Sequence, residues 1–288
     1  FDPASGKSTI SVVDPSSVSA TPQFDTPLVE VRDIALAGRE TAWLTGLAAA
    51  GNVMAPGTAG LWTIDLSSGT VTEVGPTPNN KPLLSLDALD DRFLLGIASD
   101  GTVVRYDTVA GSWSDRGPLL DAGGQAFYPV GDAAVVAADE VYLVGLTSPP
   151  TFAANEPGQQ KLLLLNPQVL GANTTVVRGL KTTEEHLIGL ETGAGDNLIG
   201  LGTQRNLYRI EPTAAGGDVQ LGRLAALPGV AHGGLSGQPG GLETDAGRND
   251  FALPLKGGET IEIGFGNEPA YQTLLDGEDT IDGGCGSD

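Results

Sequence analysis

Aspartate residues recur with glycine at a fixed spacing close to the C-terminal end of this sequence. Gly277 stands two positions before Asp279, and nine residues later Gly286 stands two positions before Asp288. Carboxylate oxygens are ligands that calcium prefers, and the ion takes roughly six to eight oxygens, so one turn of chain cannot complete a site and successive turns must stack. Stacked turns of this kind could bring the carboxylates of successive copies together around one ion. The candidate ligands are Asp276, Asp279, Asp282 and Asp288.

The same segment resembles the hemolysin-type calcium-binding nonapeptide repeats of RTX proteins, whose pattern is G-G-x-G-x-D-x-U-x with U apolar. Gly283 and Gly284 open the second copy, while Ile281 is the apolar residue of the first copy, in which Leu274 and Leu275 replace the glycine pair. The resemblance implies that the ion held by the stacked turns is calcium. It also implies a large protein exported by type I secretion, which folds when it meets extracellular calcium and whose array continues past Asp288. The alternative is a solvated, acidic, glycine-rich terminus.

The charge balance narrows the range of partners. The 288 residues include 36 Asp and Glu against 15 Lys and Arg, and the formal net charge is −21. Such a charge repels phosphate backbones and anionic lipid surfaces, so we expect no nucleic acid partner. We also expect no membrane insertion, because the most apolar long window, residues 43–62, is broken by Asn52, Pro56 and several glycines. An extracellular, cation-rich medium would screen it. Cys285 is the only cysteine, which excludes an intrachain disulfide. We expect a monomeric module of a longer chain.

Short β-rich runs return along the chain as a strand, a turn and a second strand. Repeats of about 40 to 60 residues that are filled with strands are typical of propeller blades, which hold four strands each. Residues 61–75 also resemble the repeats of bacterial propellers of the type L-x-x-I-D-x-x-x-G-x-V-x-x-V-G. The polar residues that close the first strand of each unit are Asp14, Asp65, Asp107, Asn166 and Glu211, at intervals of 51, 42, 59 and 45 residues.

These repeats predict an all-β fold, a β-propeller of five four-stranded blades, or six if another blade lies near residues 126–130 or in the glycine-rich 230s. Residues 9–13 would pair with a strand from residues 230–265 and so close the ring, which removes an exposed sheet edge. The propeller would span residues 1–265, followed by a linker and the start of the RTX repeats at 266–288. Residues 147–160 would form a surface loop.

Few other residues suggest chemistry. Asp87, Asp90 and Asp91 could place carboxylates in the central channel, although such a cluster is more often a polar turn. His186 and His232 are the only histidines, too few for the three ligands of an ordinary zinc hydrolase. The sequence predicts no catalytic residues and no organic cofactor.

The leading hypothesis is therefore an extracellular binding or adhesion module of a calcium-dependent secreted RTX protein. It would present propeller loops to a glycan, a peptide or another cell-surface ligand, because a propeller carries many variable loops on a rigid scaffold. The alternative is a calcium-dependent propeller hydrolase or lactonase whose active site lies in the central channel. A third hypothesis, a spacer without a ligand, stays open.

Overall fold

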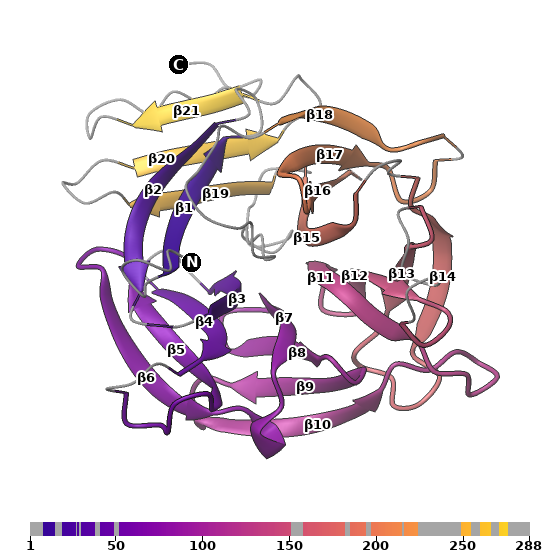
Figure 1. Ribbon diagram of the computed structural model, residues 1–288, viewed down its shortest axis with the longest axis horizontal. Coiled ribbons are helices and arrows are strands. Elements are labelled where there is room, and N and C mark those ends of the chain that lie inside the picture. Colours follow the sequence, from indigo (N-terminus) through magenta and orange to yellow (C-terminus); the bar gives the residue numbers. More distant parts are fainter. Residues whose placement is uncertain are drawn as a thin grey trace.

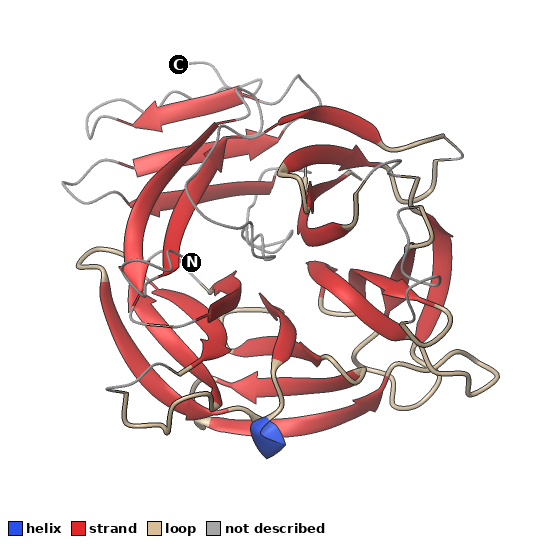
Figure 2. Ribbon diagram, in the orientation of Figure 1, coloured by secondary structure: helices blue, strands red, loops and turns tan. Residues whose placement is uncertain are grey.

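The chain folds into antiparallel sheets arranged around a common centre (Figure 1). Figure 2 shows that strands dominate the described chain and that helix is confined to one short turn, η1 (Pro78–Asn80). The structure is a computed structural model. It describes residues 8–14, 19–26, 28, 30–37, 41–48, 52–150, 158–181, 185–193, 197–214, 216–223, 249–254, 260–265 and 271–275.

Four of the sheets have four strands each, ordered as in the sequence from the centre outward (Figure 1). Blade 1 contains β3 (Glu30–Leu36), β4 (Thr41–Leu47), β5 (Ala59–Asp65) and β6 (Thr70–Pro76). Blade 2 contains β7 (Leu83–Ala88), β8 (Phe93–Ala98), β9 (Thr102–Asp107) and β10 (Ser112–Pro118). Blade 3 contains β11 (Tyr128–Ala137), β12 (Glu140–Leu146), β13 (Lys161–Leu165) and β14 (Thr174–Gly179). Blade 4 contains β15 (Leu187–Thr192), β16 (Leu198–Gly202), β17 (Asn206–Ile210) and β18 (Val219–Arg223).

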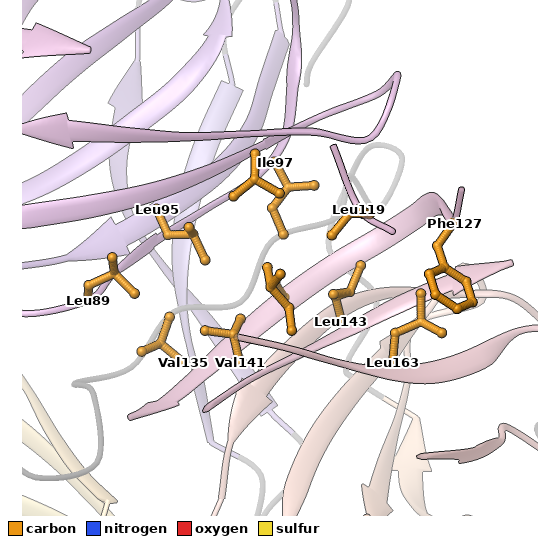
Figure 3. Packing of buried hydrophobic residues seen from close by; sticks show 12 residues of the cluster. Leu89, Leu95, Ile97, Leu119, Phe127, Val135, Val141, Leu143 and Leu163 are labelled. Atoms are coloured by element: carbon orange, nitrogen blue, oxygen red, sulfur yellow. The ribbon is translucent and has the colours of Figure 1, made fainter. Parts of the chain in front are cut away.

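The core lies between the blades, where their faces pack together. Middle strands such as β12, with the sequence EVYLVGL, are buried along nearly their whole length, as expected of a continuous apolar run covered on both faces. Between blades 2 and 3, Leu95 and Ile97 of β8 pack in one cluster with Leu143 of β12 and Leu163 of β13 (Figure 3). Outer strands such as β6 alternate between exposed and half-buried residues, because one face meets solvent.

The polar residues that mark the sequence repeat cap the turn between the third and fourth strands of a blade. Asp65 Oδ1 accepts hydrogen bonds from the backbone N–H groups of Ser67 at 2.9 Å and Ser68 at 2.8 Å. Asp107 Oδ1 accepts two equivalent bonds at 3.0 Å, and Asn166 Oδ1 accepts one at 2.9 Å. Aspartate and asparagine favour such turns because their short side chains reach the backbone two residues ahead. The repeat therefore has a local physical cause.

Two arginines on outer strands hold the outer turn of the following blade. Arg116 of β10 donates from Nε to the Pro167 carbonyl at 3.1 Å. Arg178 of β14 donates from Nη1 to the Glu211 carbonyl and from Nη2 to Asp218 Oδ1, at 2.7 and 2.9 Å. The Arg178 and Asp218 side chains are 10% and 0% exposed, so this ion pair is buried.

The described residues form four complete blades and not the five or six that the repeat count predicts. The remaining strands form a two-stranded and a three-stranded sheet, which occupy one sector of the ring in projection (Figure 1). Closure of the ring by terminal strands stays a prediction, since β1 pairs with β2, and β20 pairs with β19 and β21. These strands are β1 (Ser8–Asp14), β2 (Ser19–Thr26), β19 (Asn249–Pro254), β20 (Thr260–Phe265) and β21 (Tyr271–Leu275).

The predicted surface loop at residues 147–160 is confirmed at residues 148–150, whereas Gln160 at its end is buried, at 1% exposed. Residues 147–150 and 158–160 contain no strand, and Ser148, Pro149 and Pro150 are exposed. Residues 151–157 lie outside the described residues, as does the predicted RTX tail from Asp276 to Asp288.

Candidate functional site

Buried carboxylates occur on the innermost strand of every complete blade. These strands follow one another around the ring, with β3 in contact with β7, β7 with β11, and β11 with β15, and they face the middle of the ring in Figure 1. Burial of charged groups is costly unless hydrogen bonds compensate for the lost water, so the partners of these side chains decide their role. The four residues are Asp33 on β3, Asp87 on β7, Asp132 on β11 and Glu191 on β15, all at most 6% exposed.

The carboxylates bind backbone N–H groups, and three of them reach the next blade. Each aspartate uses Oδ1 for the N–H of the residue that follows it, at 2.7 to 2.8 Å. Its Oδ2 accepts from an N–H on the innermost strand of the following blade. These bonds run from Leu86 to Asp33 at 2.6 Å, from Val135 to Asp87 at 2.8 Å, and from Leu190 to Asp132 at 3.2 Å.

A serine completes a regular pattern in these inter-blade bonds. Ser85 Oγ accepts from the Ala133 N–H at 3.1 Å. Asp33, Ser85 and Asp132 occupy equivalent positions on the innermost strands of blades 1, 2 and 3. Each binds the N–H of the residue that follows the equivalent position on the innermost strand of the next blade. Asp87, two residues beyond Ser85, repeats the contact two residues further along β11. The inner strands are thus joined by side-chain to backbone bonds in two layers.

Burial and repulsion from neighbouring carboxyl groups favour the neutral forms of Asp33 and Asp87. Burial raises the pKa of Asp33 well above its ordinary value, and repulsion and a hydrogen bond with Asp132 raise it further, against the opposing backbone N–H bonds. Burial also raises the pKa of Asp87, with repulsion from Glu191 as the next cause. A neutral acid beside a carboxylate can exchange a proton. In this ring, however, both oxygens of Asp33 and of Asp87 already accept backbone N–H groups.

The carboxylates predicted for the channel are only partly brought together. Asp87 lies there, whereas Asp90 and Asp91 are exposed in the turn between β7 and β8, where Asp90 Oδ1 accepts the N–H groups of Arg92 and Phe93 at 2.8 and 2.7 Å. Sequence reasoning missed Asp33, Asp132 and Glu191. Their signal is a lone acid that returns in the innermost strand of successive blades.

Metal ligands and histidines contribute little to the described site. Within the ranges that the structure describes, no group of three or more His, Cys, Asp or Glu side chains is placed to hold a metal ion. The four predicted calcium ligands lie outside these ranges, so calcium binding stays a prediction. His186 precedes β15, and its carbonyl accepts the Thr203 N–H at 2.9 Å. His232 lies outside the described residues.

A second candidate feature is the loop between β4 and β5, which holds an apolar side chain in solvent. Val53 is 95% exposed. Its N–H and that of Met54 each donate to one oxygen of the Glu73 carboxylate, both at 2.9 Å. The Met54 side chain packs into the blade 1 cluster that contains Trp62. Residues 53 and 54, which form the loop tip discussed here, are therefore held by a carboxylate on β6 and by an apolar anchor.

Comparisons with known proteins give no family for this chain and only weak structural similarities. No family model and no curated protein matches the chain. Among solved structures it is similar to the extracellular domain of a hybrid two-component system from B. thetaiotaomicron, with 16% identity, a TM-score of 0.40, and coverage of 93% of this chain and 30% of that one. The structure of YCF48 bound to D1 peptide has 11% identity and a TM-score of 0.42, and the match covers 89% of this chain and 66% of that one. The structure of oligogalacturonate lyase in complex with manganese has 10% identity and a TM-score of 0.41, and the match covers 94% of this chain and 70% of that one. The chain spans less than a third of the first of these, and no functional conclusion follows for it.

The described part of the chain holds no helix with the length and apolar character needed to cross a membrane.

Proposed function

We propose that this chain is a binding module of a larger, secreted, calcium-dependent protein of the RTX type. Its propeller loops would contact a glycan, a peptide or another cell-surface ligand outside the cell. The observation that carries the proposal is the fixed, solvent-exposed tip of the β4–β5 loop.

A fixed apolar tip suits recognition because little further ordering is needed on binding. The hydrogen bonds that the Val53 and Met54 N–H groups donate to Glu73, together with the buried Met54 side chain, hold residues 53 and 54 before any ligand arrives. Val53 then offers its side chain to a partner at a small entropic cost. The net charge of −21 favours a neutral or basic ligand over an anionic one.

The chemistry of the channel also favours binding over catalysis. A general acid or base must have an oxygen within reach of a substrate atom. The Asp33 and Asp87 oxygens are instead engaged by backbone N–H groups of their own and the following blade. In this proposal the carboxylates hold the scaffold together, and the loops carry the function.

Substitution of Val53 tests the loop. The probe is a microarray of immobilised neutral oligosaccharides and basic peptides, read with the labelled full chain. We expect Val53→Ser to weaken the signal of bound spots, whereas Val109→Ser, at a position 78% exposed in the β9–β10 turn, leaves it unchanged. Because both side chains are in solvent, neither change should alter stability. Equal signals from both variants, or no bound spot with the unchanged chain, would remove the support for this function.

The calcium component has its own test. Asp279→Ala should weaken calcium-induced ordering of a chain that is extended by several nonapeptide repeats, because each site needs oxygens from stacked turns. Circular dichroism and calorimetry at about millimolar calcium, the range of extracellular modules, measure this ordering. If the extended chain shows no response to calcium, the RTX assignment is wrong, while the loop-binding proposal is unaffected.

A hydrolase with its site in the channel is the second candidate, and the contact between Asp33 and Asp132 favours it. Asp33, whose pKa is raised by burial and by the neighbouring Asp132 carboxyl group, could act as an acid with the Asp132 carboxylate as the base. A panel of lactones and aryl esters, assayed with calcium, tests this alternative. Turnover that disappears in Asp132→Asn, in protein that stays folded, would favour the hydrolase over the binding module.

A further inference from the structure

The small β1–β2 sheet repeats the geometry of the outer half of a blade. In each of the four blades, the third and fourth strands form a hairpin with a β-bulge at the same place. The bulge lies opposite the step into the third-strand residue that is three positions before the closing polar residue. The bulged residues on the fourth strands are Val74, Arg116, Val177 and Leu221. In the β1–β2 hairpin, Gln23 is bulged opposite the step from Ile10 to Ser11, and Ser11 is three residues before Asp14. Five hairpins thus share one bulge position.

The β19–β20 hairpin repeats the geometry of the inner half of a blade. Residues 250–253, with the sequence DFAL, correspond to residues 33–36, with the sequence DIAL. The pairing agrees, because Leu253 lies opposite Ile261 as Leu36 lies opposite Ala42. The second strand also begins alike in the two hairpins, since both Thr41 and Thr260 follow a glutamate.

Together, these correspondences fix how the two halves would join. In blades 1 and 2 the second strand places Thr41 opposite Asp65 and Phe93 opposite Asp107, the closing polar residues. Thr260 stands at the position of Thr41, so the same rule pairs it with Asp14, the closing residue of β1. The adjacent pairs would then join Ile261 with Val13 and Glu262 with Val12.

In the structure, that edge of β20 is held by β21. Thr260 lies opposite Leu275, and Glu262 lies opposite Thr273. The residue of β21 at the closing position is therefore a leucine, where the four blades and β1 have Asp, Asn or Glu. By this criterion β1 fits the third-strand position better than β21 does.

We propose that β1 and β21 are alternative partners of the same edge of β20. When β1 takes the edge, β19, β20, β1 and β2 form one further four-stranded blade, and the ring is closed by strands from both ends of the chain. A two-stranded sheet is marginal alone and an exposed sheet edge readily accepts another strand, so both halves gain from joining. This proposal is independent of the binding function and of calcium.

Disulfide trapping in the full chain tests the exchange. In a Cys285→Ser background, the double variants Val12→Cys with Glu262→Cys and Val13→Cys with Ile261→Cys report β1 on β20. Two neighbouring pairs are needed because hydrogen-bonded and non-hydrogen-bonded positions alternate along the strands and differ in Cα separation. The pair Glu262→Cys with Thr273→Cys reports β21, and Val13→Cys with Glu262→Cys, one residue out of register, is the matched control.

We expect an intramolecular disulfide in at least one β1–β20 pair at a yield severalfold above the out-of-register control. Thr273→Pro, which removes a donor from β21, should raise that yield and Val12→Pro should lower the yield of the other β1–β20 pair. If both β1–β20 pairs stay at the level of the control while the β21 pair forms, β1 does not use this edge. Covalent dimers in place of intramolecular disulfides would also overturn the proposal.

Discussion

Removal of the Asp87 side chain should loosen the contact between blades 2 and 3. In Asp87→Ala, the N–H groups of Ala88 and Val135 lose acceptors that now lie at 2.7 and 2.8 Å. Ser85→Ala is the matched control two residues away. It removes one inter-blade bond, but the Ala133 N–H keeps its bond to Asp132 Oδ1 at 2.8 Å. The two variants differ in whether a buried donor is left without a partner.

The magnitude follows from that difference. A buried N–H without an acceptor costs about 1–3 kcal/mol, so two of them cost roughly 2–6 kcal/mol. Loss of a buried acid whose pKa is raised by burial and by repulsion from Glu191 offsets part of this cost. We expect Asp87→Ala to lower the free energy of unfolding by roughly 2–4 kcal/mol and Ser85→Ala by less than about 1.5 kcal/mol.

Urea denaturation followed by tryptophan fluorescence measures both values, because Trp43, Trp62 and Trp113 lie in blades 1 and 2. The slope of the transition must be the same in all three proteins for the midpoints to be compared. An equal loss in the two variants would mean that the inter-blade bonds of Asp87 do not contribute as argued.

Two further predictions concern charge. Arg178→Met, which leaves the Asp218 carboxylate buried without its cation, should cost about 3–5 kcal/mol in urea denaturation. Arg92→Met, where the arginine side chain that pairs with Asp107 is 55% exposed, should cost much less because water screens the pair. Similar losses in the two variants would contradict the role of burial. Because the pKa values of Asp33 and Asp87 are raised on folding, the native state binds more protons than the unfolded state above pH 3.8, so stability should fall as pH rises toward neutral. This fall in stability with rising pH should be smaller in Asp33→Asn than in Asp91→Asn, whose side chain is exposed. The measurement is the urea midpoint as a function of pH, and equal slopes in the two variants would refute the role of Asp33. Asp107 acts in the opposite sense, since hydrogen bonding to Arg92 lowers its pKa to about 2 and its contribution is lost only as pH falls toward that value.

The sequence reveals features whose cause is local. Asp65, Asp107 and Asn166 mark the repeat because each caps a turn within three residues of itself. The four-stranded blades follow from that repeat and from the apolar middle strands. The number of blades depends on which strands from the two chain ends pair with each other, and no turn or local spacing encodes that choice.

The carboxylates of the channel were only partly predictable from the sequence, because their partners are distant along the chain. The Asp33 carboxylate is bound by an N–H that lies 53 residues away in the sequence, so its partner cannot be read from its neighbours. Asp90 and Asp91, in contrast, look like a cluster because they are adjacent, yet both face solvent in a turn. The fixed tip at Val53 was missed because it depends on Glu73, 20 residues away.

The hydrogen bonds between the innermost strands have a direction that bears on synthesis of the chain. In the four bonds described above between innermost strands, the acceptor side chain belongs to the earlier blade and the N–H donor to the later one, as with Asp33 and Leu86 or Asp132 and Leu190. During synthesis on a ribosome, each finished blade would thus expose solvated side-chain oxygens, which bind the N–H groups of the next blade once that blade has been made. Water solvates an exposed carboxylate well, so the unpaired acceptors of an incomplete ring keep it soluble. Each new blade can then pack against the innermost strand of the blade before it as it emerges.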